Sequence, residues 1–258
     1  MSTTLVSLLA ALQPAAAAGQ PADQNKLSFS IVDIVSHMGP AAIVVASVLA
    51  IFALYTIAVF IERLYVFGRV RSVANQFGPV AAKHLEKAEH AALIKAGVAD
   101  KHNYLGHMVA AGIKTYDKAA AEPSADVAPI ELARRELQRQ ADAANQRLRR
   151  GLPTMASVGS TAPFVGLLGT VLGIIEAFGK IGGDGSAGIG TVGAGIAEAL
   201  VVTAFGLMVA IPAVLCFNFL TTKADQILLA LDQSRGELTD YLEARSNPAG
   251  RREIANAA

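Results

Sequence analysis

Two long uncharged segments lie close together in the second half of this chain, and they constrain its fold more than any other feature. Residues 151–175 hold 25 residues without a charge, and residues 199–222 hold 24. A helix crosses the hydrocarbon core of a bilayer with about 20 apolar residues. The carboxylate of Glu198 directly precedes the second segment, where an ionisable group is costly and is therefore a candidate functional residue. The sequence predicts a pair of membrane-spanning helices.

A third uncharged segment, residues 39–61, comes earlier in the chain and ends at the charged pair Glu62 and Arg63. The whole chain is 53% hydrophobic, its mean hydropathy is +0.43, and its apolar residues are clustered rather than spread evenly. That distribution indicates an integral membrane protein rather than a soluble protein with a large core. We therefore predict an all-α polytopic membrane protein with three transmembrane helices, and we expect Glu62 and Arg63 to be solvated interfacial charges.

The basic residues near the ends of these segments predict the topology, because Lys and Arg concentrate on the cytoplasmic side of a membrane. They flank residues 62–150 and follow residue 222, which places the amino terminus outside the cytoplasm and the carboxyl terminus within it. The expected parts are an outward-facing amino-terminal extension (1–38), a first span (39–61), a cytoplasmic helical domain (62–150), a second span (151–175), a short outward loop (176–194), a third span (195–222) and a cytoplasmic helical tail (223–258).

The first 38 residues allow two interpretations. An apolar run at residues 5–12 followed by alanines at 15–18 is similar to a secretory signal peptide with a small-residue cleavage site. Because no Lys or Arg precedes the apolar run, an alanine-rich extension that is not cleaved fits equally well.

Residues 62–150 alternate apolar and charged positions in the way that is typical of an amphipathic helical bundle. We predict helices from Pro79 to about Gly97, from Asn103 to about Ala121, and from about Pro129 toward Arg150. One continuous helix over residues 192–245 would be about 80 Å long and would extend well beyond the membrane. The histidines of this domain lack the spacing of a metal site, so we expect them to be solvated or to pack: His84, His90, His102 and His107.

Small residues and prolines interrupt the second and third spans. We expect four glycines to let the helices pack closely, namely Gly166, Gly169, Gly173 and Gly206. Two prolines are expected to kink the helices, Pro163 and Pro212. The hydroxyl of Thr161, beside Pro163, is a candidate for lining a polar path.

Several classes of function are disfavoured. The glycines are not followed by the Lys-Ser/Thr pair of a phosphate-binding loop. Cys216 is the only cysteine, so a cysteine cluster cannot hold a metal, and the net charge of +1 gives no general attraction for nucleic acid. We expect no cofactor and no nucleic-acid partner, and an enzyme is the least favoured class.

The segments STAPFVGLLGTVLGII (160–175) and GIAEALVVTAFGLMVAIPAVLCFN (195–218) resemble the paired motifs of the MotA/TolQ/ExbB proton channel family, most closely those of its ExbB-type members. The resemblance implies a homopentamer around a central pore in a bacterial inner membrane. It implies as partners an ExbD-like single-span dimer in the pore and a TonB-like protein that energises import of siderophores and vitamin B12, with membrane lipids around the pentamer. It assigns Thr161, Glu198 and Thr203 as polar pore residues and leaves the essential titrating aspartate to the ExbD-like partner.

Three alternatives remain open. A TolQ-like subunit would power the Tol-Pal envelope system, and a MotA-like stator would drive a flagellum. From a different class, the chain could be a non-conducting membrane scaffold in which Glu198 is only a charge at a helix end.

Overall fold

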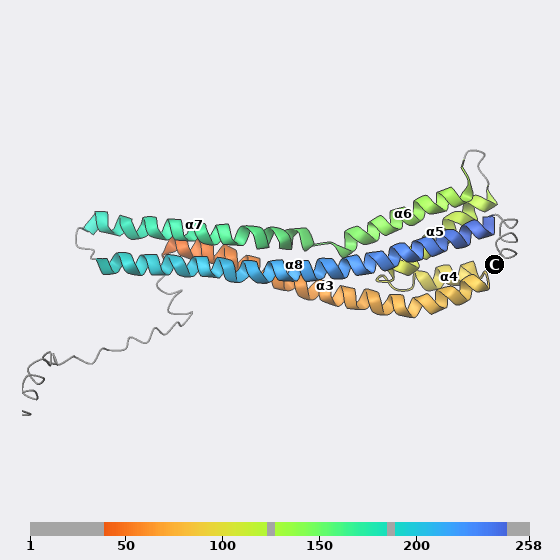
Figure 1. Ribbon diagram of the computed structural model, residues 1–258, viewed down its shortest axis with the longest axis horizontal. Helices are drawn as coiled ribbons and strands as arrows, with labels where there is room; N and C mark the ends of the chain where they lie inside the picture. The colour runs from red at the N-terminus through yellow and green to blue at the C-terminus, as the bar shows by residue number, and fades with distance from the viewer. Residues whose placement is uncertain (1–38, 123–126, 185–188, 247–258) are drawn as a thin grey trace, which may run out of the picture. The chain divides into compact units, whose positions relative to one another are not determined.

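The computed structural model describes residues 39–122, 127–184 and 189–246, and these residues form helices without a β-strand (Figure 1). In chain order the helices are α3 (Pro40–Glu86), α4 (His90–Gly97), α5 (Tyr104–Ala121), α6 (Pro129–Leu148), α7 (Leu152–Asp184) and α8 (Ile189–Ser246). The prediction of an all-α protein is confirmed. The predicted amino-terminal extension and the last residues of the predicted tail lie outside the described residues.

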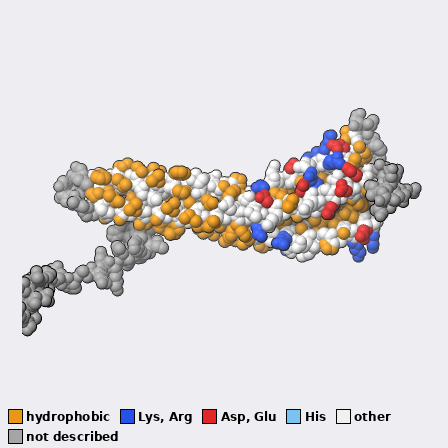
Figure 2. All heavy atoms as spheres, viewed as in Figure 1, with side chains coloured by type: hydrophobic (Ala, Val, Ile, Leu, Met, Phe, Trp, Pro, Cys, Tyr) orange, Lys and Arg blue, Asp and Glu red, His pale blue; other side chains and the backbone are white. Residues whose placement is uncertain are grey.

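Three stretches of the described chain are long and apolar enough to cross a membrane, and α3, α7 and α8 carry them. The largest helix–helix contact joins α7 to α8, and α3 packs against both helices. Figure 2 shows hydrophobic side chains over this part of the molecule, with most charged side chains gathered toward the other end, where α6 and the end of α8 lie in Figure 1. The prediction of three spans is therefore confirmed by the length and composition of the helices.

Helices α4, α5 and α6 pack with the second half of α3 and the second half of α8. We call this part the helical domain, and it consists of residues 62–150 and 223–246. Its core consists of buried aliphatic and aromatic side chains drawn from every helix of the domain. The largest fully buried members are Leu93, Met108, Ile113, Leu137, Leu148 and Leu242. Burial of such side chains contributes about 1.5–3 kcal/mol each.

The expected helix start at Pro79 is wrong, because α3 runs without a break from Pro40 to Glu86 with Pro79 inside it. A proline in a helix interior removes the hydrogen bond to the carbonyl four residues earlier, here that of Asn75. Asn75 is exposed, so water can reach that part of the helix. Phe77 and Ala81 are buried on either side of the proline and hold the helix against the core. Packing therefore outweighs the lost hydrogen bond.

Arg63 also differs from the expectation of a solvated charge. It is only 5% exposed, and its Nη1 donates a hydrogen bond of 2.9 Å to the carbonyl oxygen of Arg147 in the last turn of α6. Its Nη2 pairs with the exposed carboxylate of Glu62. Carbonyls at a helix end have no helical donor and carry the negative end of the helix dipole. Tertiary structure thus provides an acceptor for Arg63 that the sequence alone does not reveal.

The helices extend into residues 176–194, which the sequence assigns to a glycine-rich loop. Helix α7 continues to Asp184, and α8 already begins at Ile189. Glycine is a poor helix former in isolation, but at Gly195 it permits a close contact. A Cβ atom added there would lie 2.7 Å from the Cβ of Ala177 on α7. Helix–helix packing offsets the low helix propensity of this segment.

Candidate functional site

The site is built on the contact between α7 and α8, where two glycines face each other. A Cβ atom placed on Gly166 would lie 3.1 Å from the Cα of Thr203 and 3.2 Å from the Cα of Gly206. A Cβ atom placed on Gly206 would lie 2.8 Å from the carbonyl oxygen of Ala162. These are backbone atoms, which cannot move aside as a flexible side chain can. The two helices therefore approach as closely as helix backbones allow.

The contact continues along the same two helices toward Glu198. A Cβ atom on Gly169 would lie 2.5 Å from Cγ1 of Val202 and 3.1 Å from Cγ1 of Val45 on α3. A Cβ atom on Gly173 would lie 2.8 Å from the Cβ of Ala199. Gly169 thus lies where all three membrane helices meet, and the row of glycines on α7 faces the row of small side chains on α8.

Thr203 lies within this contact. Its hydroxyl donates a hydrogen bond of 2.8 Å to the carbonyl oxygen of Gly166, and the residue is half-buried. The bond joins α7 to α8 inside one chain. As a donor the hydroxyl is therefore occupied, while its oxygen can still accept a hydrogen bond from water or from another group.

Thr161 occupies a different environment. It is exposed on α7, and its hydroxyl donates a hydrogen bond of 2.7 Å to the carbonyl oxygen of Ser157. Pro163, two residues later, lacks an N–H group, so the carbonyl oxygen of Gly159 loses its usual helical donor. This turn of α7 therefore combines the exposed hydroxyl of Thr161 with a carbonyl that lacks its helical donor, although Gly159 itself is buried against Val214 of α8.

Glu198 lies at the amino end of α3. The backbone N–H of Gly39 donates a hydrogen bond of 2.6 Å to its Oε1. Glu176, on α7, comes to the same place, because a Cβ atom added to Gly39 would collide with the Glu176 carboxylate. A helix amino terminus offers unsatisfied N–H groups and the positive end of the helix dipole. The structure therefore gathers two carboxylates from two helices at the start of a third.

The three residues singled out from the sequence do not form one cluster. Glu198 and Thr203 are five residues apart on α8, about 7.5 Å along its axis. Thr161 is next in sequence to Ala162, whose carbonyl oxygen lies close to Gly206 of α8. Gly206 is about one helical turn beyond Thr203. They occupy successive depths of the α7–α8 pair. Pro163 and Pro212 both lie inside continuous helices.

Sequence reasoning missed Gly39 and Glu176 as members of this site. The Gly-Pro pair at residues 39–40 is the available signal, because proline is favoured at the first position of a helix and marks where free N–H groups begin. It also missed two threonines that are buried in the spans, Thr56 on α3 and Thr170 on α7. Among the described residues, no cluster of His, Cys, Asp and Glu is arranged to hold a metal ion.

Comparison with known proteins bears on the same helices. The model of the family described as "MotA/TolQ/ExbB proton channel family" matches residues 100–233, which include both motifs and most of α7 and α8. The chain is 47% identical over 100 residues to the biopolymer transport protein ExbB of Xanthomonas campestris pv. campestris. It is 47% identical over 93 residues to the ExbB protein of Neisseria gonorrhoeae. It is 38% identical over 119 residues to the Tol-Pal system protein TolQ of Pseudomonas aeruginosa.

These alignments cover part of each protein. They span 39% of this chain and 40% of the Xanthomonas protein, 36% and 42% for the Neisseria protein, and 46% and 52% for the Pseudomonas protein. The chain thus matches about half or less of the length of these relatives.

Proposed function

This chain belongs to the MotA/TolQ/ExbB proton channel family, whose model spans more than half of it, and we propose that it is the proton-channel subunit of a TonB–ExbB–ExbD-like complex. In this proposal it forms a homopentamer in the inner membrane of a bacterium, with its amino terminus in the periplasm and its helical domain in the cytoplasm. The proton gradient then drives a TonB-like protein that energises outer-membrane import of siderophores and vitamin B12.

One observation supports this proposal above others: the α7–α8 pair carries polar groups at successive depths but few groups that can titrate. The three spans hold one carboxylate, Glu198, and Glu176 directly follows the second span; both lie at the end where α3 begins. A proton that crosses the remaining depth needs further acceptors. An ExbD-like single-span dimer in the pore would supply the missing acid, with Thr161 and Thr203 hydrogen-bonding its carboxylate or a bridging water.

The energy available is adequate for mechanical work. Moving one elementary charge across 100 mV releases about 2.3 kcal/mol, so several protons can drive one conformational step. Glu198 is proposed to act at the entry to the path, where the N–H of Gly39 holds its carboxylate. The close glycine contact lets α7 and α8 move as one wall segment.

The first test is proton flux into liposomes that contain the chain together with an ExbD-like partner. We expect Glu198→Gln to lower the flux roughly tenfold or more, since about 1.4 kcal/mol of added barrier has that effect. Glu237→Gln is the matched control, because Glu237 is an exposed carboxylate in the part of α8 that belongs to the helical domain. Equal flux for both variants at equal protein content would contradict the role of Glu198, and flux without any partner would contradict the need for an external acid.

A TolQ-like role in the Tol-Pal system is the second candidate, favoured by the likeness to the Pseudomonas TolQ protein. The two roles share chemistry and differ in partner. Co-purification of an ExbD-like and TonB-like pair, with siderophore uptake lost on deletion, supports the first role. Co-purification of Tol-Pal components, with defective envelope constriction, supports the second role.

A further inference from the structure

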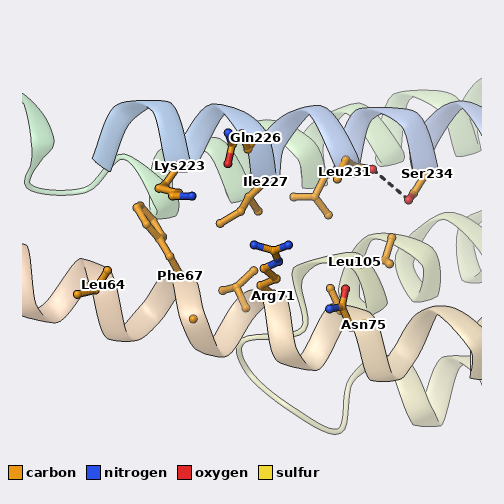
Figure 3. Close-up of a pocket in the computed structure, with 14 residues that line it drawn as sticks. Leu64, Phe67, Arg71, Asn75, Leu105, Lys223, Gln226, Ile227, Leu231 and Ser234 are labelled. Atoms are coloured by element: carbon orange, nitrogen blue, oxygen red, sulfur yellow. Dashed lines mark hydrogen bonds between the residues drawn. The ribbon is translucent and has the colours of Figure 1, made fainter. Parts of the chain in front are cut away.

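A groove of about 550 Å³ lies between α3 and α8 where these helices leave the membrane segment (Figure 3). Its walls are mainly hydrocarbon, including Leu64, Phe67 and Ile227. Two cationic side chains also line it, Arg71 from α3 and Lys223 from α8. Figure 3 shows both of them extending into the space between the two helices.

The charged side chains that line the groove are all positive. Its remaining polar lining residues are neutral, namely Asn75, Gln226 and Ser234, and none of its lining residues is a carboxylate. Within the described part of the chain, neither Arg71 nor Lys223 forms a salt bridge, although Arg63 and Arg69 on the same helix do. Lys223 instead lies over the ring of Phe219, 5.7 Å from its centroid. Two cations without a counter-charge attract an anion.

The groove lies next to the ends of the two membrane segments, so an anion bound there would lie at the edge of the bilayer. The uncharged run of α8 ends at residue 222, so Lys223 is the first charge that follows this run, and the uncharged run of α3 ends at residue 61. Side chains on a helix tilt toward its amino end. For both helices that end is the membrane segment, so Arg71 and Lys223 tilt toward the bilayer edge. Exposed apolar side chains continue from the spans into the groove on both helices: Ile57, Ile61, Leu64, Leu215 and Phe219.

We propose that this groove binds an anionic phospholipid of the leaflet next to the helical domain. Arg71 and Lys223 hold the phosphate, and an acyl chain runs back along the exposed apolar surfaces of α3 and α8. The two contributions together select this class of ligand. A free phosphate ion gains nothing from the apolar walls, and a zwitterionic lipid brings an ammonium group for which the groove offers no carboxylate. The proposal requires a membrane-embedded chain and does not depend on proton conduction.

The test compares lipid retention by the full-length protein in detergent, measured by native mass spectrometry. The probes are phosphatidylglycerol and phosphatidylcholine with identical acyl chains. We expect the wild type to retain phosphatidylglycerol preferentially, and Arg71→Gln/Lys223→Gln to lower that retention roughly tenfold or more, because charge-assisted hydrogen bonds are the strong ones. The control is Arg147→Gln/Arg150→Gln, which removes two exposed basic side chains next to α7 and leaves the Arg147 carbonyl in place.

A second pair of variants tests the groove without changing charge. Gly68 lines the groove, and a Cβ atom added there meets nothing within 4 Å, so a side chain can start from this position without a clash. We expect Gly68→Phe to fill the groove and lower phosphatidylglycerol retention, while Gly68→Ala leaves it unchanged.

Four results would overturn the proposal. Equal loss of phosphatidylglycerol in both double variants means that general charge attracts the lipid. Equal retention of both lipids by the wild type means that the net charge of the headgroup does not determine binding. Displacement of the lipid by excess inorganic phosphate identifies a free-anion site. A change of oligomer mass with Gly68→Phe, with lipid retention unaltered, means that a second copy of the chain covers the groove.

Discussion

The α7–α8 contact of the membrane part and the core of the helical domain are both built from packed helices, yet they pack by different means. In the membrane part, α7 and α8 meet through Gly166 and Gly206, whose backbones touch. In the helical domain, large side chains such as Leu137 and Leu148 fill the space between helices. The same helix, α8, takes part in both contacts and changes its mode of packing near Lys223. Along α8, small residues therefore make the contacts of the apolar segment, and large side chains make those of the helical domain.

The physical reason lies in the driving force. In water, burying a large side chain removes apolar surface from solvent, which contributes about 25 cal/mol per Å². In lipid the surroundings are as apolar as the helix itself, so van der Waals contact and interhelical hydrogen bonds must hold the helices together. Small residues maximise that contact, and the bond from Thr203 to the Gly166 carbonyl adds a polar link.

The largest effect is expected in the helical domain. Leu137→Ala removes a fully buried side chain from its core, and we expect it to lower the free energy of unfolding by about 2–5 kcal/mol. Chemical denaturation of the detergent-solubilised protein measures the loss. The control is Leu229→Ala, because Leu229 is 61% exposed on α8.

The neighbour of Leu137 sharpens this prediction. A Cβ atom on Gly112 would lie 2.5 Å from Cδ2 of Leu137, so Gly112→Ala should destabilise the wild type. In the Leu137→Ala background the obstacle is gone, and the same change should restore part of the stability. Additive effects of the two changes would show that the pair is not in direct contact.

The next largest effect is expected in the membrane part, where the opposite change is harmful. Gly206→Leu forces a side chain against the Ala162 carbonyl and the Gly166 backbone, and we expect a loss of about 1–3 kcal/mol from overpacking. Thermal unfolding in detergent measures it. Gly193→Leu on the same helix is the control, since its Cβ meets nothing within 4 Å. Equal stability of the two variants would remove the distinction between the two modes of packing.

A smaller effect is expected at the start of α5. The Asn103 side chain accepts a hydrogen bond of 2.9 Å from the N–H of Gly106 and donates one of 3.2 Å to the Gly97 carbonyl. Asn103→Ala loses this helix cap and should cost about 1 kcal/mol. Asn103→Asp keeps the acceptor but not the donor, so denaturation curves should place it between the wild type and the alanine variant.

The smallest effect is a pH dependence in the helical domain. The His102 backbone N–H, followed by the Arg69 guanidinium, donates to Asp100 and lowers the pKa of that carboxyl. A lowered pKa in the folded state means that the carboxylate stabilises the fold above its unfolded pKa of about 3.9 and loses this contribution as the pH falls through the folded value.

Thermal midpoints of the wild type and Asp100→Asn between neutral and acidic pH test this linkage. The wild type should be the more stable protein at pH 7. The difference between the two thermal midpoints should disappear as Asp100 becomes protonated. A gap that stays constant down to the acidic limit would assign the effect of the substitution to something other than the ionised carboxylate.

Much of the fold was predictable because hydrophobic runs and helix signals are local. Patterns within single segments predicted the three spans and the starts of α5 and α6 near Asn103 and Pro129. They also predicted that α8 continues without a break beyond its apolar segment. The extension of α3 through Pro79 was not predictable, because the burial of Phe77 and Ala81 decides it. The burial of Arg63 depends on the carbonyl of Arg147, 84 residues away in the chain.

The candidate site shows the same division. By itself the sequence determined where polar residues interrupt the apolar runs, and the resemblance of two motifs to a known family singled out three of them: Thr161, Glu198 and Thr203. Only the tertiary structure decided their surroundings. It joined Thr203 to Gly166, left Thr161 exposed, and brought Glu198 and Glu176 to the amino end of α3. The reason is that backbone donors and acceptors are the same at every residue, so only the approach of distant helices determines which polar groups they meet.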